Sequence, residues 1–279
     1  MSDLFSSLTS HRRGDDGRYE FAFGEAASIW SVNGGYLAAA ALRLAGTVGR
    51  KATPASLAAH FLRPVQTGSA FGRCETIDEG SSTELLAIHI TQNDRLCASV
   101  HVSSISTKEG VEQRLARMPL VPHPEELRAL EEIIQPGEPP PSRFWMIFDQ
   151  RPINRNGDTI RRFQDPRYLR WFRHREDLLY SDTYLNAASA LPIIDTVGMI
   201  AAWQSGKRAL RSVRAPTMSL FVNFFEQNVA PGWMLCDARS EYAASGLIST
   251  RVEIWSVDGR LLSQGISQML TIGAPKSGQ

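Results

Sequence analysis

The sequence has no excess of charge of one sign. It contains 30 Lys and Arg against 29 Asp and Glu, which gives a net charge of +1 at pH 7. A nearly neutral chain lacks the broad basic surface that nucleic acids or anionic membranes attract. Its 279 residues, 43% of them hydrophobic, suit one large globular domain or two of ordinary size. We therefore expect neither nucleic acid nor membrane as a partner.

Cysteine is scarce, and long hydrophobic runs are missing. Cys74, Cys97 and Cys236 are odd in number and far apart, without the spacing of a zinc site or redox pair. The first residues lack the apolar core of a signal peptide. The longest nearly apolar run, 190–203, carries Asp195 and is too short to span a bilayer. These absences predict a reduced, cytoplasmic, soluble protein without metal or cofactor.

Several catalytic signatures are also absent. The sequence contains no G-x-S-x-G elbow, Walker A loop, GxGxxG or HExxH motif, and no D-x-N-P-x-H motif. These gaps disfavour serine α/β-hydrolases, phosphate-binding loops, dinucleotide folds, zinc proteases and hydratases. Any hydrolytic chemistry must rest on other residues.

What is present is a plan that occurs twice. Pro54 and Pro216 lie 162 residues apart, and Asp94 and Asp258 lie 164 apart, within segments of matching pattern. Each half reads as a strand, a long helix and a four-stranded antiparallel meander whose buried face the helix covers. The expected first-half elements are a strand at 18–24, a helix at 33–47 and strands at 56–65, 70–92 (two, with a turn) and 95–106. The second-half counterparts are 144–153, 183–204, 215–227, 232–256 and 259–273.

Two segments depart from this plan. Residues 108–142 are rich in proline and hold a short amphipathic stretch, which predicts a partly helical linker. Residues 161–177 mix arginines with aromatic side chains. Acidic residues interrupt this charge, so a solvated insertion, or a rim for nucleotide phosphates, is favoured over RNA binding. The expected organisation is a unit at 1–107, the linker at 108–142, and a unit at 143–279 with 161–177 inserted.

Four motifs carry a resemblance to a known family. "NGGYLAAAALR", "HFLRP" (60–64), "MPLVPHPEE" (118–126) and "DGRLLSQGISQML" resemble the acyl-CoA thioesterase II-like family, over roughly 18–273. The resemblance implies an α+β double hot-dog fold, in which each of two tandem units wraps a curved antiparallel sheet around a central helix. It also implies hydrolysis of acyl-CoA by water in fatty acid metabolism, without metal or covalent intermediate, by a homodimer or higher homo-oligomer.

In that family an Asp and a Gln hold and activate the water, with a Thr beside them. A carboxylate base and preorganised hydrogen-bond donors are what attack by water requires. Thr217 matches the Thr. Counting along the last strand gives Ser267 at the Gln position, next to Gln268, which fits only if a bulge or gap intervenes. Gln264 is a weaker candidate.

The family's Asp falls on Ala187, and the nearest carboxylates are Asp182 and Asp195. We take Asp195 as the most plausible base, which gives Asp195, Thr217 and Gln268 as the catalytic set. The alternative is a non-catalytic binder of acyl groups or acyl-CoA that has lost the base. A third possibility is a scaffold or binder of aromatic compounds that uses 161–177.

Asn33, Gly34 and Gly35 open the first central helix. Asn is a good N-cap, and glycines leave the first N–H groups uncovered, so this end can receive a polarised carbonyl or oxyanion. The same pattern also fits an ordinary capped helix packed closely on its sheet. His60 alternates with apolar residues and either lines the acyl-CoA groove or is a hydrogen-bonded strand histidine. We take all four as candidate substrate-binding residues.

Overall fold

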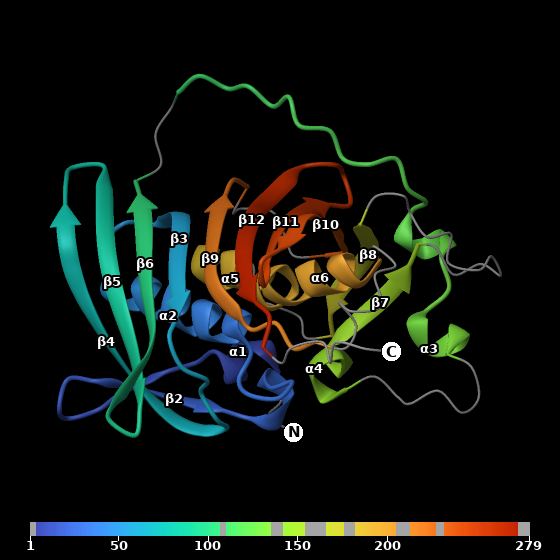
Figure 1. Ribbon diagram of the computed structural model, residues 1–279. Helices are drawn as coiled ribbons and strands as arrows, with labels where there is room; N and C mark the ends of the chain where they lie inside the picture. Colours follow the sequence, from blue (N-terminus) through green and yellow to red (C-terminus); the bar gives the residue numbers. More distant parts are fainter. Residues whose placement is uncertain are drawn as a thin grey trace.

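The computed structural model describes residues 4–106, 110–134, 142–153, 166–175, 182–204, 213–226 and 232–272. Within these ranges twelve strands form one antiparallel sheet in the order β1-β2-β4-β5-β6-β3-β9-β12-β11-β10-β8-β7 (Figure 1). The first-half strands are β1 (Arg12–Arg13), β2 (Tyr19–Phe23), β3 (Thr53–Phe61), β4 (Gly68–Glu79), β5 (Thr83–Gln92) and β6 (Arg95–Ile105). The second-half strands are β7 (Phe148–Pro152), β8 (Arg167–His174), β9 (Thr217–Phe224), β10 (Met234–Ala244), β11 (Leu247–Ser256) and β12 (Leu261–Leu270).

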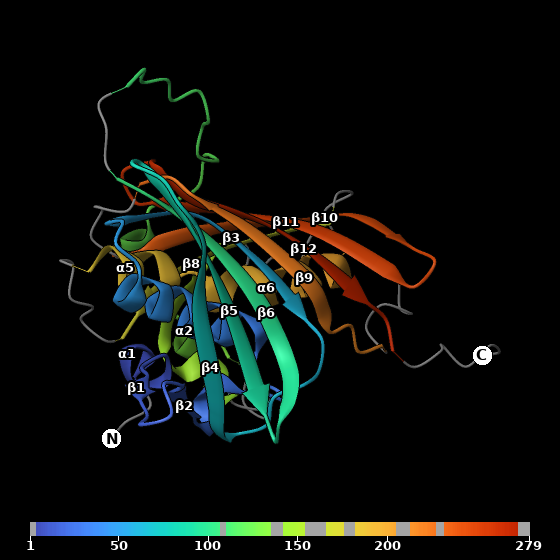
Figure 2. The same cartoon turned by 90° about the vertical axis from the view of Figure 1, so that its left-hand side faces the viewer.

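The strand order shows the duplication. The first unit runs β2-β4-β5-β6-β3 and the second runs β8-β10-β11-β12-β9 in mirrored order, so β3 and β9 meet at the centre of the sheet. They pair antiparallel, with Ala58 opposite Phe221. Seen from the side, the sheet curves over the helices (Figure 2). The predicted α+β double hot-dog fold is confirmed.

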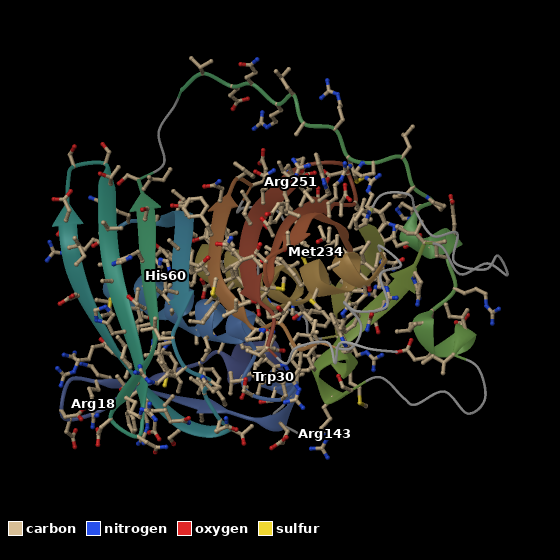
Figure 3. The ribbon with its side chains drawn as sticks, viewed as in Figure 1. Arg18, Trp30, His60, Arg143, Met234 and Arg251 are labelled. Atoms are coloured by element: carbon tan, nitrogen blue, oxygen red, sulfur yellow. The ribbon has the colours of Figure 1, made fainter. Side chains whose placement is uncertain are left out.

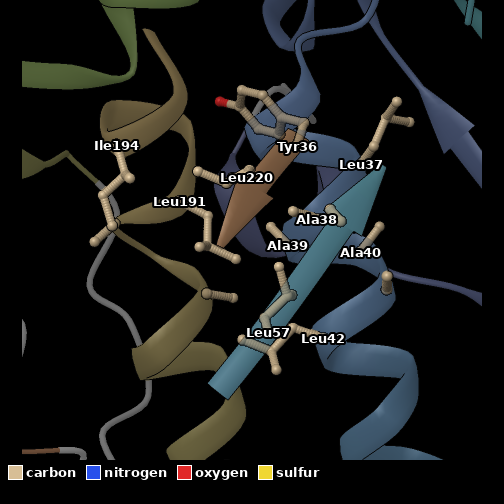
Figure 4. Close-up of a cluster of buried hydrophobic side chains, with 14 of the residues drawn as sticks. Tyr36, Leu37, Ala38, Ala39, Ala40, Leu42, Leu57, Leu191, Ile194 and Leu220 are labelled. Carbon is tan, nitrogen blue, oxygen red and sulfur yellow. The ribbon is translucent and has the colours of Figure 1, made fainter. Parts of the chain in front are cut away.

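Two central helices fill the concave side of the sheet. α2 (Gly34–Val48) carries four fully buried alanines at 38–41, and α6 (Leu191–Gln204) lies against it. Leu57 of β3 and Leu220 of β9 pack onto both helices (Figure 4). The two helices cross so closely at Gly35 that a Cβ on this residue would lie 2.4 Å from the carbonyl oxygen of Leu191. Small residues thus let α2 reach both its sheet and its partner helix.

The expected helix over 183–204 is present in two parts. α5 (Thr183–Ala188) ends just before α6 begins, because Pro192 has no amide hydrogen to continue the first helix. By length and composition this 22-residue stretch could cross a membrane, since an 18-residue window of it has mean hydropathy 1.4, but 83% of that window is buried in the molecule. It is therefore explained as the core helix of the second unit.

The structure corrects the sequence prediction at the start of the second unit. Residues 143–146 form a helical turn, α4 (Arg143–Met146), before β7 begins. Residues 167–174, expected within an insertion, form β8, which pairs with β7 and β10. β8 occupies the place that β2 has in the first unit. The expectation of an inserted segment is wrong for these residues, and the remainder of 161–177, apart from 166 and 175, lies outside the described residues.

The segment between the units covers one outer face of the sheet. Its described part contains two short helical turns, η2 (Pro124–Glu126) and α3 (Leu130–Ile133), and otherwise runs as an extended chain (Figure 1). Met118, Val121 and Leu127 pack on Trp171, Leu235 and Trp255. The Trp171 indole Nε1 donates a hydrogen bond of 3.0 Å to the Pro122 carbonyl. Both faces of β8 are therefore covered, which hides the alternating pattern expected of a half-exposed strand. The two remaining helical turns, α1 (Phe5–Leu8) and η1 (Glu25–Ala27), precede α2.

Candidate active site

A cavity of about 520 Å³ lies where the two units meet. It is bounded by the start of α2, the end of β3, one side of α6 from Asp195 to Trp203, the start of β9 and the end of β12. Its lining is mainly apolar and includes Trp30, Leu37, Phe61, Trp145, Met199, Trp203, Met218 and Met269. The charged residues of the lining are Arg63, Asp195 and Arg214. A cavity of this size and character suits a small apolar ligand with a few polar anchors.

Asp195 is the buried carboxylate of this cavity. It sits in the second turn of α6 and is only 6% exposed. Its Oδ2 accepts hydrogen bonds from Asn33 Nδ2 at 2.8 Å and from the Gly35 N–H at 3.1 Å. Its Oδ1 is buried and makes no hydrogen bond of ordinary geometry within the described structure. The two oxygens are therefore in different environments, one held by the protein and the other available.

The environment of Asp195 perturbs its acidity in opposite directions. Burial is the largest influence and raises the pKa of the carboxyl above its usual range. The Thr217 hydroxyl, the N–H groups of Gly35 and Gly34, and the Asn33 amide act against burial and lower this pKa. Thr217 thus neighbours the carboxyl without completing a full hydrogen bond to Oδ1. A carboxylate with a raised pKa is a stronger base, as proton abstraction from water requires.

A bulge in β9 turns Thr217 toward the cavity. Gln268 pairs with Ser219, but the next residue, Met269, pairs with Thr217, so Met218 is extra on its strand. Without the bulge, Thr217 would share the outer face with Ser219. With it, Thr217 lines the same cavity as Asp195 and the buried Met269.

The sequence of the chain that forms this site matches two family models. The acyl-CoA thioesterase N-terminal domain matches residues 25–105, and the acyl-CoA thioesterase C-terminal domain matches residues 112–270. The chain belongs to the acyl-CoA thioesterase family. Membership supports thioester hydrolysis as the general activity. No curated protein gives a significant match to the sequence.

Solved structures agree with this thioesterase fold. The acyl-CoA thioesterase II TesB2 of Mycobacterium marinum superposes with a TM-score of 0.79 at 19% identity, over 98% of this chain and 99% of that one. A hot-dog protein of unknown function from Alicyclobacillus acidocaldarius gives the same TM-score and identity over 97% and 98%. The tesB protein of Mycobacterium avium subspecies paratuberculosis gives 0.78 at 18%, over 96% and 98%. At such identities the likeness establishes the fold alone.

The structure corrects two of the residues expected in the thioesterase site. His60 is exposed on the outer face of β3, and Figure 3 shows it over the sheet, well away from Trp30 at the cavity. Its neighbour Phe61 lines the cavity instead. Gln268 is exposed on the outer face of β12 because the bulge lies in β9 and leaves the alternation of β12 intact. Neither side chain is part of the cavity lining.

The position of the expected Gln is filled differently. Ser267 faces inward, is 3% exposed and shares a hydrogen bond of 2.7 Å with the Thr250 hydroxyl. Gln264, the weaker candidate, donates to Glu253 Oε1 at 3.1 Å. No glutamine side chain belongs to the cavity lining in the described part of the chain.

The structure also separates the carboxylates considered for the base. Ala187, at the expected Asp position, is buried in α5 and does not line the cavity. Asp182 caps α5 by accepting the N–H groups of Tyr184 and Leu185, each at 3.0 Å. Asp195 is the one of these positions that reaches the cavity.

The start of α2 has a role that sequence reasoning missed. Asn33 and Gly34 line the cavity, but the N–H of Gly35 and the amide of Asn33 bind a protein carboxylate instead of pointing freely at a ligand. A signal for this contact was available. Asn33 and Asp195 are 162 residues apart, the same offset that separates Pro54 from Pro216. No cluster of three or more His, Cys, Asp or Glu is arranged to hold a metal ion in the described ranges.

Proposed function

We propose that this chain hydrolyses acyl-CoA thioesters with Asp195 as general base and Thr217 as a water-positioning hydroxyl. The observation that carries the proposal is the buried Oδ1 of Asp195, which makes no hydrogen bond of ordinary geometry within the described residues and lies in a cavity that Thr217 also lines. An acceptor without a donor inside an apolar cavity is costly unless water or substrate satisfies it. A water held between Oδ1 and the Thr217 hydroxyl meets this need.

The reaction follows from that placement. Oδ1 takes a proton from the water as its oxygen forms a bond to the thioester carbonyl carbon, which gives a tetrahedral oxyanion. Collapse of this intermediate breaks the carbon–sulfur bond, and the proton on Oδ1 passes to the CoA thiolate. The products are a free acid, CoA and an ionised Asp195 ready for another cycle. No covalent enzyme intermediate is formed.

The remaining lining suits the rest of the substrate. The apolar side chains from α6 and from the start of β9 provide a surface for the acyl group. Arg63 and Arg214 supply positive charge to the same lining and suit the phosphates of the CoA moiety. Acyl-CoA is therefore the substrate class that the cavity fits.

One observation favours a second candidate, an acyl-CoA binder without turnover. The family's Asp position is Ala187 and its Gln position is Ser267, so two of three expected catalytic side chains are missing from their usual places. A binder needs the cavity but not a base. Turnover is the property that separates the two candidates.

The test is thiol release from a panel of acyl-CoAs of increasing length, one of them aromatic, at pH 7–8. We expect hydrolysis by the wild type and a fall in kcat of about 10²–10⁴-fold in Asp195→Asn, because the amide cannot accept the proton. Thr217→Val should lower kcat less, since it removes only a positioning hydroxyl. Gln268→Ala, a change on the outer face, is the matched control.

Each outcome has a distinct meaning. Unchanged turnover in Asp195→Asn would move the base elsewhere and overturn the proposal. No turnover by the wild type, with acyl-CoA still bound in a calorimetric titration, would establish the binder instead.

A further inference from the structure

The strongest polar contact at the cavity joins the two halves of the chain. Asn33 begins the first central helix and Asp195 lies near the start of the second, and their side chains meet at 2.8 Å. The two positions are 162 apart in sequence, with Asn33 capping α2 and Asp195 in the second turn of α6. The strands β3 and β9 of the two units are antiparallel neighbours at the sheet centre. The pair is thus a contact between the two units, with an amide on one side and a carboxylate on the other.

The orientation of the Asn33 amide is fixed on both sides. Its Oδ1 accepts the Gly35 N–H at 3.0 Å, which caps α2. Its Nδ2 donates to Asp195 Oδ2 at 2.8 Å and to Thr196 Oγ1 at 3.1 Å. The Thr196 hydroxyl in turn donates to the Pro192 carbonyl at 2.8 Å, so it can only accept from Asn33. Turning the amide over would place a carbonyl oxygen against the carboxylate and lose all three bonds.

This fixed amide makes the two carboxylate oxygens unequal. Oδ2 receives the Asn33 and Gly35 donors, whereas Oδ1 receives none of ordinary geometry. A carboxylate oxygen that already accepts two N–H groups is a poor site for a proton, because protonation would set an O–H against those donors. The proton must therefore go to Oδ1.

The first unit cannot perform the same chemistry. Asn33 is neutral, and the bulges at Ala55 in β3 and at Met218 in β9 place Pro54 where the second unit has Thr217. The first unit has neither base nor hydroxyl at these places, and its amide is committed to the base of the other unit.

We propose that Asn33 is a positioning residue for hydrolysis, which holds Oδ2 of Asp195 and leaves Oδ1 as the one oxygen that takes the proton from water. This inference rests on the proposed role of Asp195. It makes the site a composite, with the base from the second unit and its support from the first.

The decisive variant is Asn33→Ser. Serine retains the helix cap, because its hydroxyl also accepts the Gly35 N–H, but it lacks the amide that donates to Oδ2. We expect kcat to fall about 10–100-fold with KM nearly unchanged, since substrate contacts remain. We also expect the acidic limb of the pH–rate profile to move to higher pH, because one donor that stabilises the ionised carboxylate is gone. A purely structural role would leave that limb in place.

Two further variants test which unit must supply the carboxylate. Asn33→Asp retains the cap but sets a second carboxylate against Asp195, so the two share a proton and the acidic limb should move further upward. Combining Asn33→Asp with Asp195→Asn restores one amide and one carboxylate in exchanged positions. This exchanged protein should be as stable as the wild type yet inactive, because its carboxylate belongs to the unit that has Pro54 in place of Thr217.

The outcomes separate this inference from the proposed function. If Asp195→Asn abolishes turnover while Asn33→Ser keeps the wild-type kcat and pH profile, the positioning role is wrong and the base assignment stands. If the exchanged protein is active, either unit can supply the carboxylate and the inference is overturned. If Asp195→Asn remains active, the proposed base fails and takes this inference with it. The pH dependence of thermal unfolding in Asn33→Ser reports on the Asp195 carboxyl without any turnover and should show the same upward shift.

Discussion

The two hot-dog units share a plan but differ in what covers them and in what they offer the site. In the first unit the outer face of the sheet is bare, and Ile77 of β4 is 53% exposed. In the second unit the linker covers that face, and Trp171 and Trp255 are each 1% exposed. The second unit also holds Asp195 and Thr217, whereas the first supplies Asn33 and Gly35.

This difference shows how the two units of a duplicated fold can contribute different residues to one site. Both copies must keep a small-residue helix against a curved sheet, since that packing forms the core. Only one copy needs reactive groups at the shared boundary. The other is then free to replace its carboxylate with an amide, which supports a neighbouring charge instead of repelling it.

The largest expected effect is at the crossing of the two central helices. In Gly35→Ala the new Cβ would lie 2.4 Å from the Leu191 carbonyl oxygen and 2.5 Å from the Pro192 Cα, which are backbone atoms that cannot rotate away. The helices must separate, so we expect a loss of about 3 kcal/mol or more in the free energy of unfolding, or failure to fold. Urea unfolding measures it.

The matched change in the second unit is Gly198→Ala. Its Cβ would meet the Thr250 hydroxyl at 2.3 Å and the Thr250 Cβ at 2.8 Å, which belong to a strand side chain and not to the backbone of a crossing helix. We expect a smaller loss of stability than for Gly35→Ala. Equal losses would show that the helix crossing is no more constrained than an ordinary helix–sheet contact.

The covered and bare outer faces give the next effect. Trp255→Ala should lower the free energy of unfolding by about 3–5 kcal/mol, because it empties a cluster that the linker closes. Ile77→Ala, at an exposed position in the first unit, should change it by less than about 0.5 kcal/mol. Denaturant midpoints of the two variants provide the comparison. A small effect at Trp255 would mean that the linker does not stabilise the second unit.

Much of the fold could be predicted from the sequence, for reasons that particular segments make clear. The strands predicted at 70–92 and 95–106 leave Asn93 and Asp94 between them, and both residues adopt the positive φ that Asn and Asp tolerate in a tight turn, at 52° and 57°. The helix at 33–47 followed from its cap and its alanines. β8 could not be recognised because the linker buries Trp171 on its outer side, so the strand has no polar face to mark it.

The site was less predictable, because an error of one residue along a strand moves a side chain to the opposite face of the sheet. Thr217 could be placed from its position in sequence, but its inward direction depends on the bulge at Met218, a local event that no composition signals. Asp195 could be named as a carboxylate on a buried helix. To predict its partner, Asn33, the 162-residue offset between Pro54 and Pro216 would have to be applied to the polar residues as well.

The buried charge at the boundary predicts a pH-dependent effect of intermediate size. Asp195 has a pKa raised above its ordinary value of 3.8, chiefly by burial. A raised pKa means that the carboxyl favours the folded state below its unfolded pKa and loses that contribution as the pH rises through its folded pKa. Asp195→Asn should therefore be more stable than the wild type at pH 7–8, with the advantage shrinking toward pH 4. Thermal unfolding across this pH range measures the difference.

The control for this effect lies on the same protein. Asp182→Asn removes the charge of an exposed carboxylate that accepts two N–H groups but keeps a capping oxygen, so it should bring no gain in stability at neutral pH. If Asp195→Asn gave no gain either, the burial cost of the charge would be fully offset by its donors. The ionised carboxylate of Asp195 would then not lower the free energy of unfolding at neutral pH.

The smallest effects are expected at two residues that sequence reasoning placed in the site. His60 and Gln268 lie on the outer face of the sheet, so His60→Ala and Gln268→Ala should each change kcat/KM by less than about two-fold. Phe61→Ala, one residue along from His60, removes part of the cavity wall and should raise KM for long acyl-CoAs more than for short ones. Initial rates on the same acyl-CoA panel measure all three. A larger effect at His60 than at Phe61 would reverse the assignment of the two faces of β3, and with it the side of the sheet on which the substrate binds.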